Sequence, residues 1–484
     1  MRTDRPEGPR PGWACLAIVL LLGGCALAPE PARLALPVAA TYPVDAGISG
    51  SIAGVGWRNF FPEPQLQTLI AEALVNNRDL RVASNRVEEA RAALNIREGA
   101  LYPQVDAVAT GTRGRTPADL SLTGQASTTS VYRSFLSAGW ELDFWGRLRS
   151  LRAAALQRYL ATEEGRRGVA TSLIAQVASS YLLEREHAER IALARRTVTS
   201  RADSLRILRR RYEVGSGSNF EVTQARTLLA QAQSAATSLE LDRAVNRNAL
   251  AVLVGHPITF TAPPLPLDEA SEGAPLPAGL PSDLLIHRPD VIAAEHRLQA
   301  AGADIGAARA AFFPNISLTG SFGTASSQLE GLFKNGAAAW SFSPTLVLPI
   351  FTGGQNRANL DLATARRSIA VAEYERTIQE AFRDVADALV GRRQTAEQIA
   401  TTEETLTALT ERARLAQLRF DNGRSAYLEV LEAQRDLFQT EQSLIQLRRI
   451  YLASGVALYA AVGGGLADDP VFSTTTRSAQ ELPQ

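Results

Sequence analysis

Hydrophobic residues recur at intervals of three and four over two long stretches of the chain, residues 146–212 and 354–420. This spacing is typical of amphipathic α-helices. Proline, which breaks helices, is absent from residues 118–256 and again from 350–469. At 1.5 Å per residue, each stretch would form a helix of roughly 100 Å if it were continuous. The apolar positions are rich in alanine and leucine, so packing in a coiled-coil core is their main expected role.

Four shorter segments alternate apolar and polar residues with a period of two. The apolar residues expected to share a face are Tyr132, Leu136, Trp140 and Leu142 in the first half, and Ile316, Leu318, Phe322, Trp340, Phe342, Leu346, Leu348 and Ile350 in the second. The segment after Pro103 follows the pattern more weakly. Alternation over about ten residues, with aromatic residues near the ends, is typical of transmembrane β-strands, although half-buried strands of a soluble sheet look similar. We expect two hairpins, at about 103–142 and 314–351.

Four strands are too few to span a membrane alone. An open sheet in a bilayer would leave the backbone groups of its edge strands without hydrogen-bond partners. If these strands face lipid, several chains must therefore share one barrel.

The two halves of the chain repeat the same parts. The segment RYEVGSGSNFEVTQAR from Arg211 returns 208 residues later as RFDNGRSAYLEVLEAQ from Arg419, with an aromatic residue, a glycine and a Glu-Val pair at the same offsets. Upstream, residues 79–103 align with residues 290–314. We expect a first repeat at 63–255, a Pro/Gly-rich linker at 256–286, a second repeat at 287–465 and a tail at 466–484.

The N-terminus has the pattern of a secretory signal. Three arginines precede a short apolar run that ends in Leu22-Gly23-Gly24-Cys25. The segment resembles a bacterial lipoprotein signal, which implies removal of residues 1–24 and lipid attachment to Cys25 at the start of a segment spanning 25–62. An ordinary signal peptide with an incidental cysteine is the alternative.

Composition excludes several classes of protein. The 50 basic and 50 acidic residues balance, so nothing favours binding to nucleic acid. After signal removal one cysteine remains, Met1 is the only methionine, and there are four histidines, too few for a soft-metal or zinc site. His287 and His296 are better explained as solvent-facing or capping residues than as ligands. No catalytic set or phosphate loop is present, so we expect neither enzymatic activity nor a cofactor beyond the lipid.

Three sequence features together resemble a known family. They are the lipoprotein signal, the duplicated hairpin-plus-long-helix halves, and segments such as WELDFWGR (140–147), LIHRPDVIAAEHRLQAA (285–301), FFPNISLTGSFG and LPIFTGGQNRANL. They resemble the TolC-type outer-membrane efflux proteins, most closely the lipid-anchored NodT branch, over residues 57–465. The resemblance implies a homotrimer with a twelve-stranded β-barrel in the outer membrane, continued by a long α-helical barrel in the periplasm. It also implies a periplasmic adaptor and an inner-membrane pump of the RND type as partners.

The repeated turns match the periplasmic tip of that family, where the adaptor is contacted. The residues are Val214, Gly215 and Ser216 in the first half and Asn422, Gly423 and Arg424 in the second. Glycine suits the positive φ that ends a helix, and this local role is compatible with adaptor contact.

Three carboxylates follow the turns. Glu429 and Glu432 match family positions that ring the closed channel entrance, although acidic residues in a first helical turn also favour the helix dipole. Glu221 matches a position that braces the closed state. The chain departs from the family at Phe420, which lacks a tyrosine hydroxyl, and at Ser425, which replaces an arginine. The brace must then use other contacts, among them Arg211, Arg419 or Arg424.

Small-molecule export through the outer membrane is thus the expected function. A secretion channel for polypeptides and a periplasmic coiled-coil scaffold without a pore are the alternatives. The alternating strands favour a channel, because a scaffold needs none.

Overall fold

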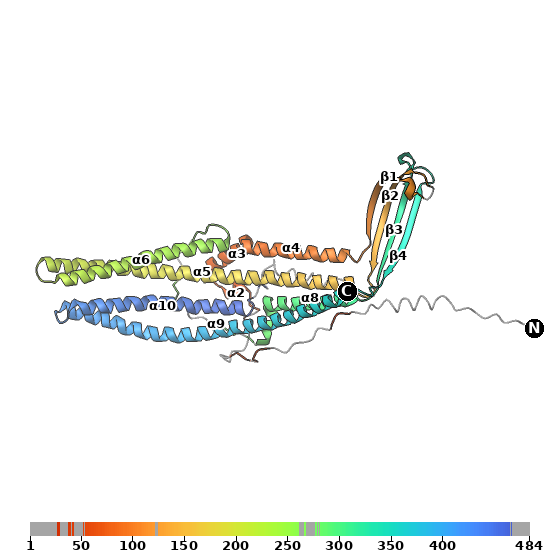
Figure 1. Ribbon diagram of the computed structural model, residues 1–484. Helices are drawn as coiled ribbons and strands as arrows, with labels where there is room; N and C mark the ends of the chain where they lie inside the picture. The colour runs from red at the N-terminus through yellow and green to blue at the C-terminus, as the bar shows by residue number, and fades with distance from the viewer. Residues whose placement is uncertain are drawn as a thin grey trace, which may run out of the picture. The chain divides into compact units, whose positions relative to one another are not determined.

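The computed structural model describes residues 27–29, 37–39, 41–42, 52, 54–121, 124–260, 266–267, 276–277, 279, 281–464 and 466. In chain order the main elements are α2 (Trp57–Phe60), α3 (Pro64–Asn76), α4 (Arg78–Gly99), β1 (Gln104–Thr116), β2 (Ser127–Leu142), α5 (Arg147–Glu213), α6 (Asn219–Val254), α7 (Leu284–His287), α8 (Pro289–Ala310), β3 (Asn315–Ser326), β4 (Ala338–Val347), α9 (Gln355–Asp421) and α10 (Tyr427–Ala461) (Figure 1). The predicted class, mainly helical with two β-hairpins, is confirmed. Within the described residues, no helix is both long and apolar enough to cross a membrane.

The two long helical stretches are continuous. α5 and α9 each contain 67 residues, as the proline-free intervals suggested. α4 and α8 also match in length, at 22 residues each, and each precedes a β-hairpin. The halves therefore repeat the order helix, hairpin, long helix, helix.

The chain separates into two compact units, and each draws segments from both halves. One unit includes residues 86–162 and 294–374 and contains the β-sheet. The other includes residues 36–85, 163–293 and 375–484, as far as they are described, and contains α3, α6, α10 and most of α5 and α9.

The sheet is antiparallel with the strand order β1-β2-β3-β4. Directly opposed residues include Ala107 with Leu136, Leu136 with Phe322, and Phe322 with Trp340. Because opposed residues point to the same side, the register gathers the predicted apolar residues on one face. β1 and β4 are the edge strands.

One strand boundary was wrong in the sequence analysis. The last strand was expected to run from Trp340 to Ile350, but β4 starts at Ala338 and ends at Val347. Leu348 and Ile350 lie beyond it and are exposed. Pro349 stands between them, and a proline has no N–H to continue the ladder of hydrogen bonds.

The WELDFWGR segment joins β2 to α5 in the sheet-containing unit. The Asp143 carboxylate accepts hydrogen bonds from the backbone N–H groups of Leu148 (3.0 Å) and Arg149 (2.8 Å), which satisfies donors in the first turn of α5. The Trp145 ring stacks on Phe313 with 4.7 Å between centroids, and its Nε1 donates to the carbonyl of Pro314. These contacts join the end of β2 to the start of β3.

The second unit has a polar core around the middle of α5. Glu184 is fully buried and accepts from Arg243 (2.8 Å) and Arg247 (2.7 Å) of α6. Glu186, two residues on, accepts from Arg449 of α10 at 2.8 Å. Successive helical residues point about 100° apart, so these carboxylates reach different neighbouring helices. Removal of one partner of such a buried ion pair destabilises the fold, because the other charge stays buried without a partner.

The end of each half packs against its own beginning. Gly255 and Gly463 have φ of 90° and 94°, and a Cβ on either would meet a backbone oxygen, that of Asn76 or of His287, at 2.6 or 2.5 Å. Next to these contacts, the side chain of Asn77 donates to the Leu253 carbonyl. In the second half, Arg288 donates to the Ala461 carbonyl.

Candidate functional site: the helical turns and the sheet

The turns after α5 and α9 have the same geometry. Gly215 and Gly423 have φ of 78° and 67°, which confirms the predicted positive φ. The N–H of each glycine bonds to the carbonyl three residues back, and the next N–H bonds to the carbonyl five residues back, at 2.8 to 3.0 Å. This is the Schellman arrangement that ends helices. All six predicted turn residues are exposed: Val214, Gly215, Ser216, Asn422, Gly423 and Arg424.

The helices that follow the two turns start differently. Ser218 caps α6: its hydroxyl accepts from the N–H of Phe220, and its own N–H donates to the carboxylate of Glu221 at 3.1 Å. The equivalent residue before α10 is Ala426, whose side chain cannot accept a hydrogen bond. Glu221 is therefore held at the helix start by a capping box, whereas Glu429 has no such partner.

Glu429 pairs instead with the preceding helix. Its carboxylate lies 3.1 Å from the guanidinium of Arg419 on α9, and both side chains are about half exposed. Glu432, one turn further along α10, is exposed, and its side chain makes no ion pair or hydrogen bond within the described part of the chain. The structure thus places the two carboxylates on the same stretch of α10 but in different electrostatic settings.

The two helix pairs pack on each other behind the turns through an apolar cluster. Its buried members are Leu208, Ala225, Ala416, Tyr427, Val430, Leu431 and Ala433. Leu208 and Ala416 occupy equivalent positions of the two repeats, as do Ala225 and Ala433. Behind the turns, equivalent residues of the first and second repeat therefore pack against one another.

The position that departs from the family, Phe420, lies at the edge of this cluster. The guanidinium of Arg211 lies 4.8 Å from its ring centroid, and the Tyr427 ring lies 4.9 Å away. Burial raises the pKa of the Tyr427 phenol, and the nearby Glu221 carboxylate acts in the same direction. A cation–π interaction thus adds to the apolar contacts between α5 and α9 here.

The sheet has one apolar and one polar face. The apolar face exposes Leu136, Phe322, Trp340, Phe342 and Leu346. The opposite face has rows of small polar residues; in one row Ser321 and Ser341 share a hydrogen bond of 2.7 Å between hydroxyls. An exposed apolar face on an antiparallel sheet marks contact with another apolar phase or partner.

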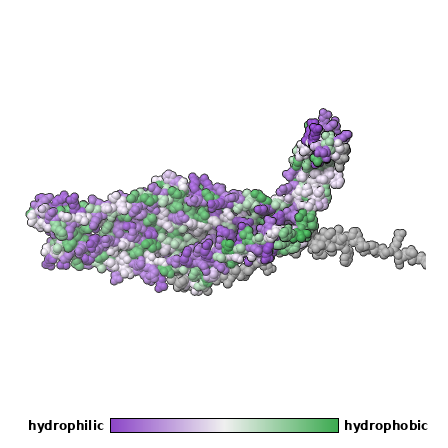
Figure 2. All heavy atoms as spheres, viewed as in Figure 1, coloured by the Kyte–Doolittle hydropathy of each residue, from purple (hydrophilic) through white to green (hydrophobic). Residues whose placement is uncertain are grey.

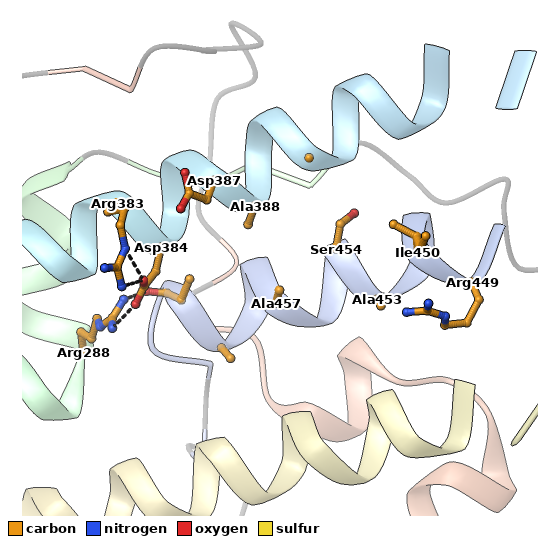
Figure 3. Close-up of a pocket in the computed structure, with 13 residues that line it drawn as sticks. Arg288, Arg383, Asp384, Asp387, Ala388, Arg449, Ile450, Ala453, Ser454 and Ala457 are labelled. Carbon is orange, nitrogen blue, oxygen red and sulfur yellow. Dashed lines mark hydrogen bonds and ion pairs between the residues drawn. The ribbon is translucent and has the colours of Figure 1, made fainter. Parts of the chain in front are cut away.

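An open groove of about 890 Å³ lies between α9 and α10 (Figure 3). At one end Arg288 and Arg383 bind Asp384, each at 2.7 Å, and small residues such as Ala388 and Ala457 line the rest. Burial alone would raise the pKa of Asp384, but the hydrogen bonds from the two arginines hold it below its ordinary value. Arg288 also pairs with Asp290 at 2.9 Å, so two arginines face two aspartates, and the residues that line the groove include no nucleophile beside a base.

The two histidines singled out by the sequence lie in different settings. His287 is exposed at the end of α7, whereas His296 is half-buried in α8 and its Nδ1 lies 2.7 Å from the side-chain oxygen of Gln157. No cluster of three His, Cys, Asp or Glu side chains in the described ranges has the arrangement of a metal site. Cys25 lies outside the described residues.

Two structurally important residues were not singled out from the sequence. Ser218 followed by Glu221 is a capping-box pattern and was visible beforehand. Arg201 of α5 was not, because only the fold shows that it is buried, stacked 5.2 Å from the Phe438 ring and bonded to the Leu228 carbonyl.

Comparison with known proteins gives consistent matches over nearly the whole chain. The sequence profile of a family described as outer membrane efflux protein matches residues 69–256 and 280–464. The solvent efflux pump outer membrane protein SrpC of Pseudomonas putida is 44% identical over 455 residues, 92% of this chain and 97% of SrpC. The cation efflux system protein CusC of Escherichia coli O6:H1 is 38% identical over 452 residues, 93% and 97% of the two chains. The solved open-state outer membrane channel MtrE of Neisseria gonorrhoeae superposes with a TM-score of 0.83 at 38% identity, covering 91% of this chain and 99% of MtrE.

Proposed function

Since the chain belongs to the outer membrane efflux protein family, and is thus an outer-membrane efflux channel, we propose that it forms the exit duct of a tripartite pump. Three copies would assemble around one pore, and a periplasmic adaptor would connect them to an inner-membrane pump of the RND type. The channel itself would perform no chemistry on what passes.

The observation that carries this proposal is the open four-stranded sheet. Among the described residues, the edge strands β1 and β4 each have a partner strand on one side only, and the apolar face of the sheet is exposed. Closure by neighbouring copies would satisfy the edges, give twelve strands from three chains, and turn the apolar face toward lipid. The polar face would then line the pore.

A lipid on Cys25 would fit this orientation. Arg309, near the end of α8, donates to the carbonyl of Leu27 at 2.9 Å, so the chain passes close to the helix-side end of the sheet. Cys25 lies two positions before Leu27, a reach of about 7 Å at most. The acyl chains would enter the periplasmic leaflet there. Replacement of Cys25 by serine should abolish acyl labelling; labelling that persists would contradict the assignment.

The exposed turns are proposed as the adaptor contact and the carboxylates behind them as the channel entrance. Three copies would bring six carboxylates, Glu429 and Glu432 of each, near one axis. Carboxylates so near one another attract cations, and their mutual repulsion opposes closer approach. Glu221, held in its capping box, would brace the entrance by fixing the start of α6 beside Tyr427.

For the exported compounds we propose small organic molecules. The relatives with 44% identity carry the names of solvent and toluene efflux pumps, while the cation efflux protein CusC is 38% identical. Uptake of toluene and of a transition-metal cation by a deletion strain, with and without the gene restored, would distinguish the two classes. Restored exclusion of the metal cation alone would refute this choice.

Adjacent residues of β3 allow a sharp test of the channel. Phe322 lies on the apolar face and Ser321 on the polar face. Phe322→Arg should block insertion, because arginine on the lipid face costs about 2–4 kcal/mol near the bilayer midplane. Ser321→Arg should insert but lower single-channel conductance in planar bilayers. Purified wild-type protein that inserts without conducting would refute the channel, and equal behaviour of the two variants would refute the assignment of the faces.

A further inference from the structure

Two arginines lie on the apolar face of the sheet at its loop end. Arg113 and Arg115 lie at even intervals along β1 from Val105, Ala107 and Gly111, and therefore on the same face of the strand. Ala107 stands opposite Leu136, which stands opposite Phe322, so this set of β1 residues points to the same side as the apolar residues of the other strands. Charged residues on this face are unexpected within a lipid-facing band.

Their height along the strands explains the exception. The apolar face extends from Leu142 at the helix end of β2 to Tyr132, ten residues away, about 33 Å along the strand. Strands in membrane barrels tilt by about 45°, so this band would span about 25 Å, the height of the apolar zone of such barrels. Tyr132 stands opposite Gly111, and the two arginines come immediately beyond that pair.

The surroundings of the arginines offer further donors. Ser130 is opposite Arg113, and Thr128 is opposite Arg115. Both guanidinium groups are exposed and form no ion pair within the described residues. Figure 2 shows hydrophilic residues gathered at this end of the sheet. Two free guanidinium groups, two hydroxyls and the Tyr132 phenol therefore border the apolar band on one side of β1 and β2.

We propose that Arg113 and Arg115 form a binding site for the phosphate groups of an anionic lipid in the outer leaflet. The proposal rests on the proposed function, because it needs the apolar face to contact lipid and the loop end to lie outside. Guanidinium groups bind phosphate oxygens through paired, charge-assisted hydrogen bonds. Acyl chains attached to that phosphate would lie along the apolar band, where Leu136 and Phe322 are exposed.

A matched control is available on the same hairpin. Arg133 of β2 is also exposed, but it stands opposite Thr110 and Ala325 and points to the polar face. It shares the charge and approximate height of the proposed site without access to lipid. A general electrostatic attraction would involve all three arginines, whereas a membrane-facing site involves only two.

The test is a lipid titration of the detergent-solubilised full-length protein, followed by native mass spectrometry. The probes are lipid A with both phosphates, lipid A without phosphates, and inorganic phosphate. The proteins are wild type, the double variant Arg113→Gln/Arg115→Gln, and Arg133→Gln. Each arginine near a charged membrane surface strengthens the binding of anionic lipid. Loss of both should therefore weaken the binding of phosphorylated lipid A about thirtyfold. Arg133→Gln should bind it as wild type does.

Three results would overturn the proposal. They are unchanged binding in the double variant, an equal loss in Arg133→Gln, and full competition by millimolar inorganic phosphate, which would show an unspecific anion site without lipid recognition. Dephosphorylated lipid A should bind wild type and double variant equally. Single-channel conductance of the wild type and the double variant separates the lipid site from the channel. If both conduct and lipid binding is unchanged, only the lipid site is refuted. If the wild type does not conduct, the channel itself is refuted.

Discussion

The carboxylates Glu221 and Glu429 occupy equivalent places in the two repeats but have different partners. Glu221 accepts from the N–H of Ser218, whereas Glu429 faces Arg419 across the turn. One replacement, serine by alanine at the position before α10, explains the difference, because an alanine cannot complete a capping box. Ala426 is thus the residue that leaves Glu429 without a capping partner.

Arg419 should control the charge of the entrance. Arg419→Gln removes the cation beside Glu429 in each of three copies and should increase the selectivity of the pore for cations, while Glu429→Gln should decrease it. The pair is half exposed, so stability should change by less than about 1 kcal/mol. Reversal potentials in a salt gradient measure the effect. Arg393, which pairs with Glu397 in the middle of α9, provides the control variant Arg393→Gln. Equal shifts in both arginine variants would contradict the assignment.

His187 should make stability depend on pH. The side chain is buried in α5, and burial lowers the pKa of its imidazole. The charged groups that act on it are Glu186, Asp242, Arg190 and Glu184. As pH falls, the unfolded chain binds a proton at this histidine near pH 6.5, before the folded chain does. The contribution of His187 to the free energy of unfolding is therefore full above that pH and is lost as pH falls below it.

Thermal denaturation of the solubilised protein at pH 8 and pH 5.5 checks this. His187→Gln should reduce the drop in midpoint between the two pH values. His287→Gln, at an exposed histidine, should leave the drop as in wild type. Equal effects of the two substitutions would show that burial of His187 is not the cause.

The helices, strands and turns could largely be predicted from periodicity, proline placement and glycine, because each depends on local geometry. The positive φ of Gly215 and Gly423 follows from their place after a helix. The partners of buried charges could not be predicted. Glu184 and Glu186 lie in a helix rich in charge, and only the arrangement of α5, α6 and α10 shows that they are buried and paired. Arg419 was named only as one of three arginines that could take part in the brace with Glu221, and its pairing with Glu429 was not predicted.

The starts of α6 and α10 should differ in local stability. Ser218→Ala should cost about 1 kcal/mol at the first turn of α6 and speed amide hydrogen exchange there. Ala426→Ser supplies the missing cap, should slow exchange in the first turn of α10, and should draw Glu429 away from Arg419. Peptide-level exchange measurements report both changes. Unchanged exchange in both variants would mean that the caps do not determine these helix ends.

Lysine is represented once in the sequence, by Lys334 in the loop between β3 and β4, where it is exposed. If the sheet closes into a barrel with its loops outside, an amine-reactive dye that cannot cross membranes should label this residue on intact cells. Lys334→Arg should abolish the signal. Labelling that appears only after the outer membrane is opened would place the loops on the wrong side and contradict the proposed orientation.

The equal lengths of α5 and α9, 67 residues each, restrict how such a chain can evolve. The turns that end them are joined by one shared apolar cluster, so both helices must reach the same level. An insertion in one helix alone would separate Leu208 from Ala416, and selection should remove it. The strands carry no such constraint between halves, and β2 and β4 have already diverged to 16 and 10 residues. Descendants of this duplication should therefore vary freely in their loops, while their long helices lengthen or shorten only in concert.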